Sequence, residues 1–254
     1  MTLTTPKLAG SSSHRNIFNL ALVAYFMISL TSCSGSQGTA ALESTHKIDP
    51  TPTPINPTSI ALESRKVMSN LNSFQFELIH AKGEGSPFNG LILTKAIGLV
   101  EKPNKLNVAL TLLLGGIIIK GGAITTEDGS YILNPLNKEW VLTSIDSSPL
   151  GFFDPSEGIE SIFNSISELH LIGRERDAFL LGGIMPANSI ASIIGETTQN
   201  DITVKLRISE NTFHLLEVEI TGKVNELDKE DIKRTIQLSR FNEAFQISSP
   251  VGMP

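Results

Sequence analysis

The sequence predicts an α+β fold in which one long, mainly antiparallel sheet is accompanied by three short helices. Most segments after residue 73 alternate between apolar and polar side chains, which is the period of a half-buried strand. Gly, Pro and Asn residues separate these segments at short intervals, as expected for strands joined by tight turns. Apolar residues recur at helical spacing in three stretches, at 58–71, 154–166 and 186–194.

The first 33 residues predict an export signal. Residues 1–16 are polar, and the apolar run that follows at 17–30 is shorter than the roughly 20 residues of a membrane-spanning helix. The next tetrapeptide, Leu30-Thr31-Ser32-Cys33, resembles the lipobox of bacterial lipoproteins, in which the cysteine is the lipid acceptor. From this resemblance we expect Cys33 to carry acyl groups such as palmitate. Two such chains suffice for stable membrane anchoring. An ordinary anchor helix or a buried helix is the alternative.

After Cys33 the composition shifts toward Ser, Thr, Gly and Pro. Closely spaced prolines between residues 50 and 57 block a helix and favour extended polyproline geometry, so this stretch predicts a semi-rigid spacer. The roughly 195 residues that follow are enough for a single domain with a large core. We therefore divide the chain into a lipoprotein signal peptide (1–33), a spacer (34–57) and a folded domain (58–254).

The folded domain is expected to begin with a helix and a strand. Thr58 or Ser59 can cap a helix whose apolar residues recur at helical spacing as far as Leu71. Residues 74–79 then change to period two and predict a strand with one wet face.

Residues 90–124 are expected to form three strands, at 90–100, 106–114 and 117–124. Turns are predicted at 102–104 and at Gly115-Gly116. The segment from Leu112 to Ile119 is apolar at consecutive positions apart from the two glycines, which predicts that both faces of these strands are dry. A central sandwich strand, a sheet covered by helices and a face lining an apolar cavity all explain this pattern.

The middle of the domain combines hairpins with a well-capped helix. Asp128-Gly129 is a strong hairpin signal before strands at 130–133 and 140–142. Asp154 can cap the next helix, with Pro155 at its first position and Glu157 at the capping-box position. Strands at 169–173 and 178–185 should flank a solvated charged turn.

The last part is expected to hold a short helix opening at 186–189 and three strands, at 202–209, 213–222 and 233–241. The first two strands alternate strictly, so each should have one wet and one dry face. Residues 226–231 are mostly charged and predict a solvated loop without the residue order of a calcium loop.

Composition excludes several classes of function. The chain after Cys33 retains 18 basic and 26 acidic residues, a net charge of about −8, which argues against a nucleic-acid partner. The histidines are isolated, and neither a nucleophile elbow nor a phosphate-binding loop is present. We therefore expect neither a metal nor a cofactor, and we expect no enzymatic activity. A catalytic pair of distant carboxylates is the open alternative.

The aliphatic content exceeds what one face of a sheet needs. A twisted sheet that curls around helices can enclose a void, and a void lined by Ile, Leu, Val and Gly would suit acyl chains. By pattern, the cavity residues are expected to be Leu110, Leu112, Ile117 and Ile119 from the sheet and Ile159, Ile162, Phe163, Ile166, Ile190 and Ile193 from the helices.

Short motifs across the domain occur in the order found in a known family. They are Gly98-Leu99-Val100-Glu101-Lys102-Pro103, Asp128-Gly129-Ser130-Tyr131 leading to Pro135 and Trp140, Asp154-Pro155 with Gly158-Ile159, Ile184-Met185-Pro186-Ala187, and Ile236-Gln237-Leu238-Ser239-Arg240-Phe241 before Ile247 and Pro250. From about residue 59 to 250 the chain therefore resembles the LppX/LprAFG family of lipoproteins.

The resemblance implies a half-barrel antiparallel sheet with helices on its concave face and a hydrophobic cavity between the two layers. It implies an acylated lipid or glycolipid as ligand, carried within the cell envelope, and a lipid exporter or acceptor protein as a further partner. The protein would then be anchored through Cys33 on the extracytoplasmic face of a membrane. The alternative is a structural or partner-binding envelope lipoprotein without a lipid cargo, whose apolar residues would form an exposed patch.

Overall fold

The structure is a computed structural model of the chain, and it describes residues 56–81, 85–88, 90–135, 137–143, 154–195 and 197–250. All of these residues belong to one compact unit that begins at Pro52. The expected signal peptide, Cys33 and most of the expected spacer lie outside the described residues, and their roles stay predictions. None of the helices in the described ranges is long and apolar enough to cross a membrane.

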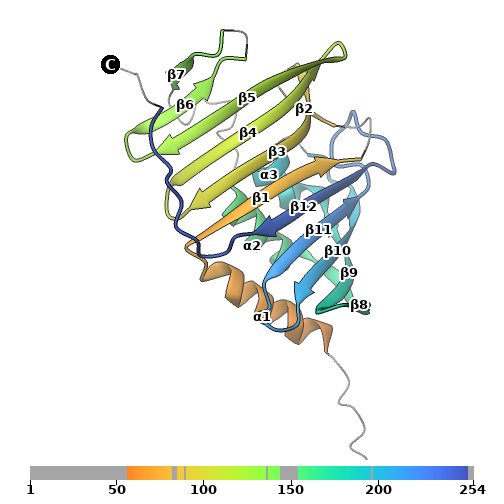
Figure 1. Ribbon diagram of the computed structural model, residues 1–254. Helices are drawn as coiled ribbons and strands as arrows, with labels where there is room; N and C mark the ends of the chain where they lie inside the picture. The colour runs from red at the N-terminus through yellow and green to blue at the C-terminus, as the bar shows by residue number, and fades with distance from the viewer. Residues whose placement is uncertain are drawn as a thin grey trace, which may run out of the picture. The chain divides into compact units, whose positions relative to one another are not determined.

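Twelve strands form one antiparallel sheet in the described part of the chain. Their bounds are β1 (Ser73–His80), β2 (Ser86–Phe88), β3 (Leu91–Glu101), β4 (Lys105–Leu114), β5 (Ile117–Thr126), β6 (Gly129–Leu133), β7 (Trp140–Thr143), β8 (Ser167–Glu175), β9 (Ala178–Pro186), β10 (Asp201–Ser209), β11 (Leu215–Thr221) and β12 (Lys233–Ser239). The strand order is β7-β6-β5-β4-β3-β1-β12-β11-β10-β9-β8, and β2 pairs with β3 beside this path (Figure 1). The helices are α1 (Pro57–Ser69), α2 (Pro155–Ser165), the 3-10 helix η2 (Ala187–Ile190) and α3 (Ala191–Ile194).

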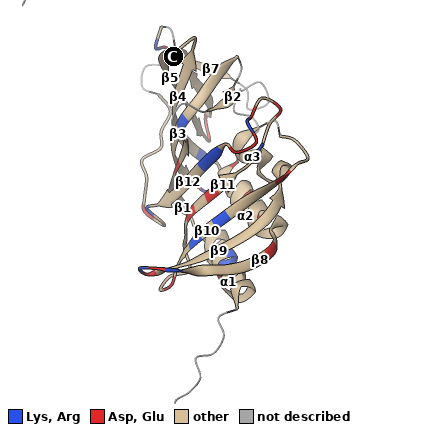
Figure 2. Cartoon of the chain, turned by 90° about the vertical axis from the view of Figure 1, so that its right-hand side faces the viewer, with Lys and Arg blue, Asp and Glu red and all other residues tan. Residues whose placement is uncertain are grey.

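The topology explains why helices cover one face of this sheet. Strands β3 to β7 and strands β8 to β12 form two antiparallel meanders, which β1 joins by pairing with both β3 and β12. Because β7 and β8 lie at opposite edges, the chain between them, which contains α2, passes from one edge to the other. Figure 2 shows the sheet curling around the side on which α2 and α3 lie. The expected α+β fold, a single strongly curved antiparallel sheet with helices on its concave face, is confirmed.

The two longer helices begin at residues whose side chains cap them. The Asp154 carboxylate accepts hydrogen bonds from the backbone N–H groups of Ser156 and Glu157, both at 2.9 Å, as the sequence predicts. The prediction of Thr58 or Ser59 as the cap of α1 is wrong. Asn56 caps this helix by accepting from the Thr58 N–H at 3.0 Å, because Pro57 suits the first helical position and moves the helix start forward.

The core lies on the concave face and follows the alternation of the strands. On β10 the inward residues are Ile202, Val204, Leu206 and Ile208, and all four are buried. On β11 the buried residues are Leu215, Val218 and Ile220, whereas the sequence pattern indicates Leu216. A register shift between Arg207 and Ile208 explains this difference, since a bulge changes which residue of the partner strand faces inward.

The end of the β4–β5 hairpin contradicts a prediction. Consecutive apolar residues between 112 and 119 predict two dry faces, yet Leu114, Ile117 and Ile118 are exposed. Leu110 and Leu112, which lie farther from the turn, are buried in the core cluster, whereas the residues beside the turn are not. The expectation of two dry faces is therefore wrong for the outer end of this hairpin.

Candidate functional site

The concave face brings together most of the residues that the sequence pattern assigns to a cavity. The fully buried members of the set share one continuous apolar cluster between sheet and helices, namely Leu110, Leu112, Ile159, Ile162, Ile190 and Ile193. Three partly buried members, Ile119, Phe163 and Ile166, pack against the same cluster. Ile117 lies apart from them at the exposed end of the β4–β5 hairpin. Whether the set lines a lipid cavity stays a prediction.

The helices are fixed tightly over the β8–β9 side of the sheet. The backbone N–H of Asp154 donates to the carbonyl of Ser192 at 2.7 Å, which ties the start of α2 to α3. A Cβ atom at Gly158 would collide with the side chain of Ile193, so the glycine permits the close approach of these helices. At the other end of α2, a Cβ at Gly183 on β9 would collide with Ile166. Glycines at these two positions thus allow the helices to pack closely against each other and against the β8–β9 side of the sheet.

The interior is more open beside β4 and β5. Gly121 lies opposite Leu110 in the β4–β5 register. A Cβ atom at Gly121 would lie 3.5 Å from the Leu112 side chain and 4.0 Å from Leu110, both ordinary van der Waals separations. The backbone of Gly121 has none of the positive φ that would strain a larger residue. This position therefore has room for a Cβ atom on the inner face.

A buried polar cluster interrupts the apolar interior at the end of β12. Arg234 donates from Nη2 to both carboxylate oxygens of Asp228, at 2.6 and 2.7 Å, and the two side chains are only 0% and 1% exposed. Arg234 Nε also donates to the Ser86 hydroxyl at 3.2 Å. The Ser86 hydroxyl lies 2.8 Å from Nε2 of His80. The prediction of a fully solvated loop at 226–231 is therefore wrong at Asp228.

Hydrogen-bond roles within this cluster fit a neutral histidine. Because arginine can only donate, the Ser86 oxygen accepts from Arg234, which leaves the hydroxyl proton free to point to Nε2 of His80. Nδ1 of His80 then donates to the carbonyl of Thr94 at 3.2 Å. Burial, together with the positive charge of Arg234, lowers the pKa of His80 to about 4. The imidazole is thus uncharged at neutral pH.

One donor of this cluster has no partner in the described part of the chain. Nη1 of Arg234 is buried and makes no hydrogen bond to any residue that the structure describes, although its side chain is completely enclosed. Buried polar groups are nearly always paired, so an orphan of this kind marks a place for a bound water or ligand oxygen. Sequence reasoning missed the site, yet a signal was present, since Arg234 falls in the same alternation as the inward-facing Ile236 and Leu238.

A separate pocket of about 280 Å³ lies at the α1–α2 end of the molecule, near the lower limit of ordinary ligand sites, which is about 300 Å³. Across it Arg65 and Glu160 form an ion pair at 3.2 Å, and Lys102 donates to the carbonyl of Ser69 at 3.1 Å. Met68, Phe74 and Ile159 supply its apolar wall, and its other lining residues are Ser156 and Glu157. The side chains of Arg65, Glu160 and Lys102 already have partners. Of the expected cavity residues the pocket includes only Ile159.

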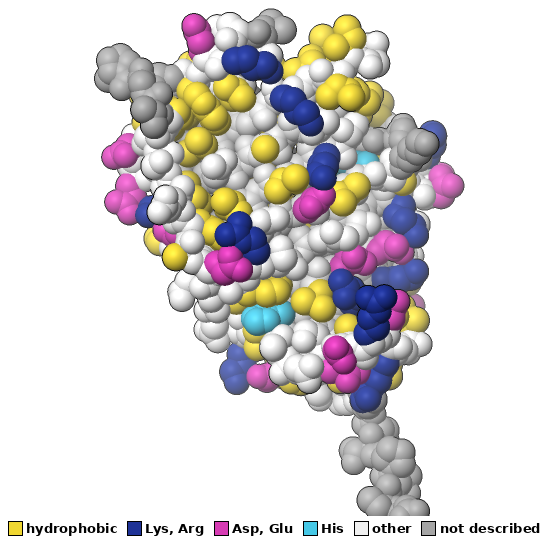
Figure 3. Space-filling view, viewed as in Figure 1, with side chains coloured by type: hydrophobic (Ala, Val, Ile, Leu, Met, Phe, Trp, Pro, Cys, Tyr) yellow, Lys and Arg dark blue, Asp and Glu magenta, His cyan; other side chains and the backbone are white. Residues whose placement is uncertain are grey.

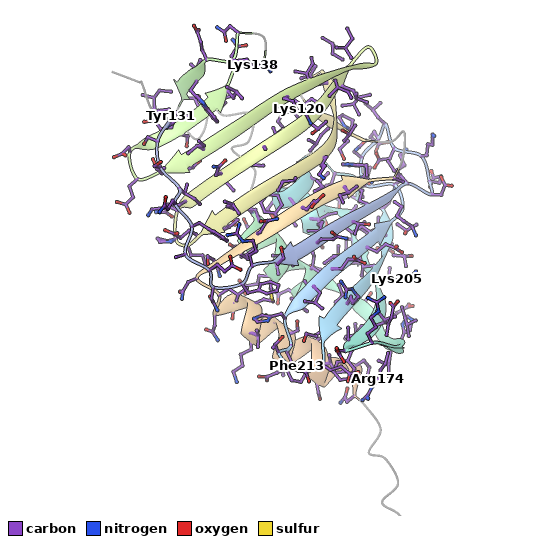
Figure 4. The ribbon with its side chains drawn as sticks, viewed as in Figure 1. Lys120, Tyr131, Lys138, Arg174, Lys205 and Phe213 are labelled. Atoms are coloured by element: carbon purple, nitrogen blue, oxygen red, sulfur yellow. The ribbon has the colours of Figure 1, made fainter. Side chains whose placement is uncertain are left out.

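The outer face of the sheet has a different character. Figure 3 shows charged and polar side chains distributed over this face, with apolar side chains gathered near its upper end. Lys205 and Lys233 both contact Glu219, at 3.2 and 3.1 Å. Burial acts to raise the pKa of Glu219, but the hydrogen bonds from these lysines outweigh it and lower that pKa. The middle of this face is therefore a solvated surface (Figure 4 labels Lys205).

The described ranges contain no group of three or more His, Cys, Asp or Glu residues placed to hold a metal ion. The buried titratable groups that the fold brings together in the described ranges, Arg234, Asp228 and His80, are linked by hydrogen bonds directly or through Ser86. Such an arrangement supports packing and ligand positioning and provides no exposed nucleophile. The absence of enzymatic activity stays a prediction.

Comparison with known proteins identifies the fold. Searches against protein-family models and against curated proteins give no match. Among solved structures, LprF from Mycobacterium bovis superposes with a TM-score of 0.60 at 14% identity, over 77% of this chain and 97% of LprF. The lipoprotein LppX from Mycobacterium tuberculosis superposes with a TM-score of 0.53 at 16% identity, over 76% of this chain and 98% of LppX. The chain therefore has the fold of these two proteins, and the resemblance inferred from the sequence is confirmed at the level of fold.

Proposed function

We propose that this protein is an envelope lipoprotein that binds an acylated lipid or glycolipid between its curled sheet and its helices and carries it within the cell envelope. The observation that carries the proposal is the continuous aliphatic interior on the concave face, in a fold shared with LprF and LppX. The cargo itself is inferred from the chemistry of this interior.

Apolar contacts alone can hold acyl chains in such an interior. Each methylene transferred from water into it contributes about 0.8 kcal/mol, so a long chain needs no directional contact. The inner face of β4 and β5 offers Leu110, Leu112 and the space beside Gly121. This side of the interior, away from the tightly packed β8–β9 side, is where we place the chains.

The orphan donor of Arg234 supports a cargo that contains acceptor oxygens. The ester and amide carbonyls of an acylated lipid accept hydrogen bonds and cannot donate them, whereas the free Nη1 group can only donate. Because Asp228 already neutralises Arg234, an uncharged carbonyl fits this donor better than a second anion would. A carbonyl at Nη1 would satisfy the donor without adding a buried charge.

We further propose that Cys33 is lipidated and holds the domain at the extracytoplasmic face of a membrane. About 23 residues separate Cys33 from Pro57, where α1 begins. In extended polyproline geometry such a spacer reaches roughly 70 Å. The carrier would thus stay close to the membrane from which it loads, and to an exporter or acceptor protein there. This role requires neither a cofactor nor catalysis.

Native mass spectrometry tests the proposed cargo. Residues 34–254, produced in a lipid-containing bacterial host and purified without detergent, should show a second mass series shifted by one or more acyl lipids. Delipidation should remove that series, and incubation with phospholipid vesicles should restore it. A single mass series of empty protein, before and after incubation with vesicles, would contradict the proposal.

A further inference from the structure

The outer end of the β4–β5 hairpin is an exposed apolar projection, and the structure gives it no role in the interior. This hairpin tip comprises Leu114, Gly115, Gly116, Ile117 and Ile118. Leu114 is 50% exposed, Ile117 69% and Ile118 65%. In Figure 3 apolar side chains form a raised group at the upper right, over this end of β4 and β5. Single exposed aliphatic residues are common, but a cluster at a protruding end indicates an interaction surface.

Both faces of the hairpin tip are apolar. Leu114 pairs with Ile117 across the two strands, and Leu113 pairs with Ile118. Because successive residues of a strand point to opposite faces, these two pairs lie on opposite sides of the hairpin. Ile92 of β3, also exposed, pairs with Leu113 and extends one of the sides. A protein partner docked on the sheet would cover one side, whereas a lipid bilayer surrounds an inserted tip on all sides.

The turn at the end of the hairpin consists of two glycines and protrudes. Gly115 and Gly116 have φ values of +54° and +87°, and no atom lies within 4 Å of a Cβ added at either position. Glycines there close the hairpin without a side chain, and the adjacent Leu and Ile residues provide all the side-chain surface of the tip. The hairpin tip is therefore a short apolar wedge at the end of two strands.

Basic side chains lie behind the tip at the level expected for lipid headgroups. Lys120 follows Ile118 by two residues, a separation of about 7 Å along a strand. Lys138 of the β6–β7 turn lies beside it and donates from Nζ to the Lys120 carbonyl at 3.0 Å (Figure 4). Interfacial apolar segments are buried about 5–10 Å into a membrane, with cations at the phosphates above them. The neighbouring acid, Glu139, accepts a hydrogen bond from Asn137.

We propose that the hairpin tip inserts into the interfacial layer of a lipid bilayer, with Lys120 and Lys138 at the headgroups. This contact is independent of the acyl anchor on Cys33 and of the nature of the cargo. It would orient the domain so that the β2–β7 end of the sheet, rather than the α1 end, faces the bilayer. Insertion of the hairpin tip can therefore be tested whether or not the protein carries lipid.

Site-specific fluorescence tests the insertion directly. Cys33 is the only cysteine of the chain, so residues 34–254, which contain the whole compact unit beginning at Pro52, are free of cysteine. Ile117→Cys labelled with the polarity-sensitive dye NBD should shift to the blue on vesicles of phosphatidylcholine with 30% phosphatidylglycerol. Lipids brominated on their acyl chains should quench it. Leu62→Cys, on α1 and 64% exposed, is the matched control and should show neither effect.

Flotation with the same vesicles measures the contribution of each group. The double variant Ile117→Ser/Ile118→Ser should bind at least tenfold more weakly, whereas Leu62→Ser/Ile172→Ser, which removes exposed apolar residues elsewhere, should bind like the unmodified protein. Lys120→Gln/Lys138→Gln should weaken binding to the anionic vesicles and leave binding to pure phosphatidylcholine unchanged. The proposal is overturned by unshifted NBD at position 117, by equal effects of the two Ser pairs, or by protein dimers that bury Ile117 without vesicles.

Discussion

Replacing Gly121 with leucine tests whether the interior holds acyl chains, because this position faces the inside of the sheet without strain. Its Cβ would lie 3.5 Å from the Leu112 side chain, so the first added carbon fits without movement. The remaining carbons of a leucine would extend into the space beside Leu110 and Leu112. They would occupy volume that we assign to the lipid.

The expected loss of lipid affinity follows from the displaced methylene groups. Leucine adds four carbon atoms to glycine, and if they exclude a similar number of lipid methylenes, about 3 kcal/mol of transfer free energy is lost at ~0.8 kcal/mol each. At 1.4 kcal/mol per factor of ten, the affinity for a long-chain fatty acid should fall by up to roughly 200-fold. The unliganded protein should be no less stable, since the proposed cavity would take up the side chain and a strand glycine is removed.

Titration of delipidated protein with a fluorescent fatty acid measures this effect, and a thermal melt of the same samples measures stability. Ala109→Leu is the control, because Ala109 is exposed on the outer face of β4, opposite Gly122. It should leave lipid affinity unchanged. If Gly121→Leu instead lowers the melting temperature and leaves binding intact, the interior is already filled, because overpacking a dense core costs about 1–3 kcal/mol. That result would refute the cavity reasoning.

Four further outcomes are expected. Asp228→Asn should destabilise the fold by about 3–5 kcal/mol in urea unfolding, because it leaves the buried Arg234 charge uncompensated, and an unchanged midpoint would contradict this. For His80 the folded pKa of about 4 lies below its ordinary 6.5, so the unfolded chain binds more protons and stability should fall by at most about 3 kcal/mol as the pH drops from 6.5 to 4. His80→Gln should lose that slope between these pH values. Asp154→Ala should cost about 1 kcal/mol through loss of the α2 cap, measured by thermal unfolding against Asp201→Ala at an exposed strand end. Cys33→Ala should leave lipid affinity in vitro unchanged and abolish labelling with a palmitate analogue, and a loss of lipid binding would show that anchor and cargo site are coupled.

Much of the fold could be predicted from the sequence because its signals are local. The alternation in β10 and the Asp154-Pro155 start of α2 depend on neighbouring residues, and both are found where the pattern places them. The errors occur where a local pattern allows two residues for one role, or where the outcome depends on pairing with a strand distant in the sequence. The cap of α1 is Asn56 and not Thr58 or Ser59, because Pro57 takes the first helical position. Leu215 and not Leu216 is buried, because a bulge between β10 and β11 shifts the register.

The candidate site was harder to predict, since its polar members come from distant parts of the chain. Ser86 and Arg234 are 148 residues apart, and they meet because β2 pairs with β3 and β1 pairs with both β3 and β12. In the sequence, Asp228 is one of several charged residues in a loop, and nothing there distinguishes it from its neighbours. Its side chain is buried in the structure because it forms an ion pair with Arg234. The apolar residues were easier, because inward-facing strand positions recur at every second residue.

By itself, the sequence determined the order and type of all the described elements except the short strand β2, the antiparallel character of the sheet and the aliphatic nature of its interior, because turn residues and periodicity act over a few positions. Only the tertiary structure decided which apolar residues face inward and which project outward. Leu112 and Ile117 belong to one apolar run, yet Leu112 lies in the core and Ile117 at an exposed tip. The physical reason is that burial depends on what packs against each strand position, and residues distant in the sequence supply those contacts.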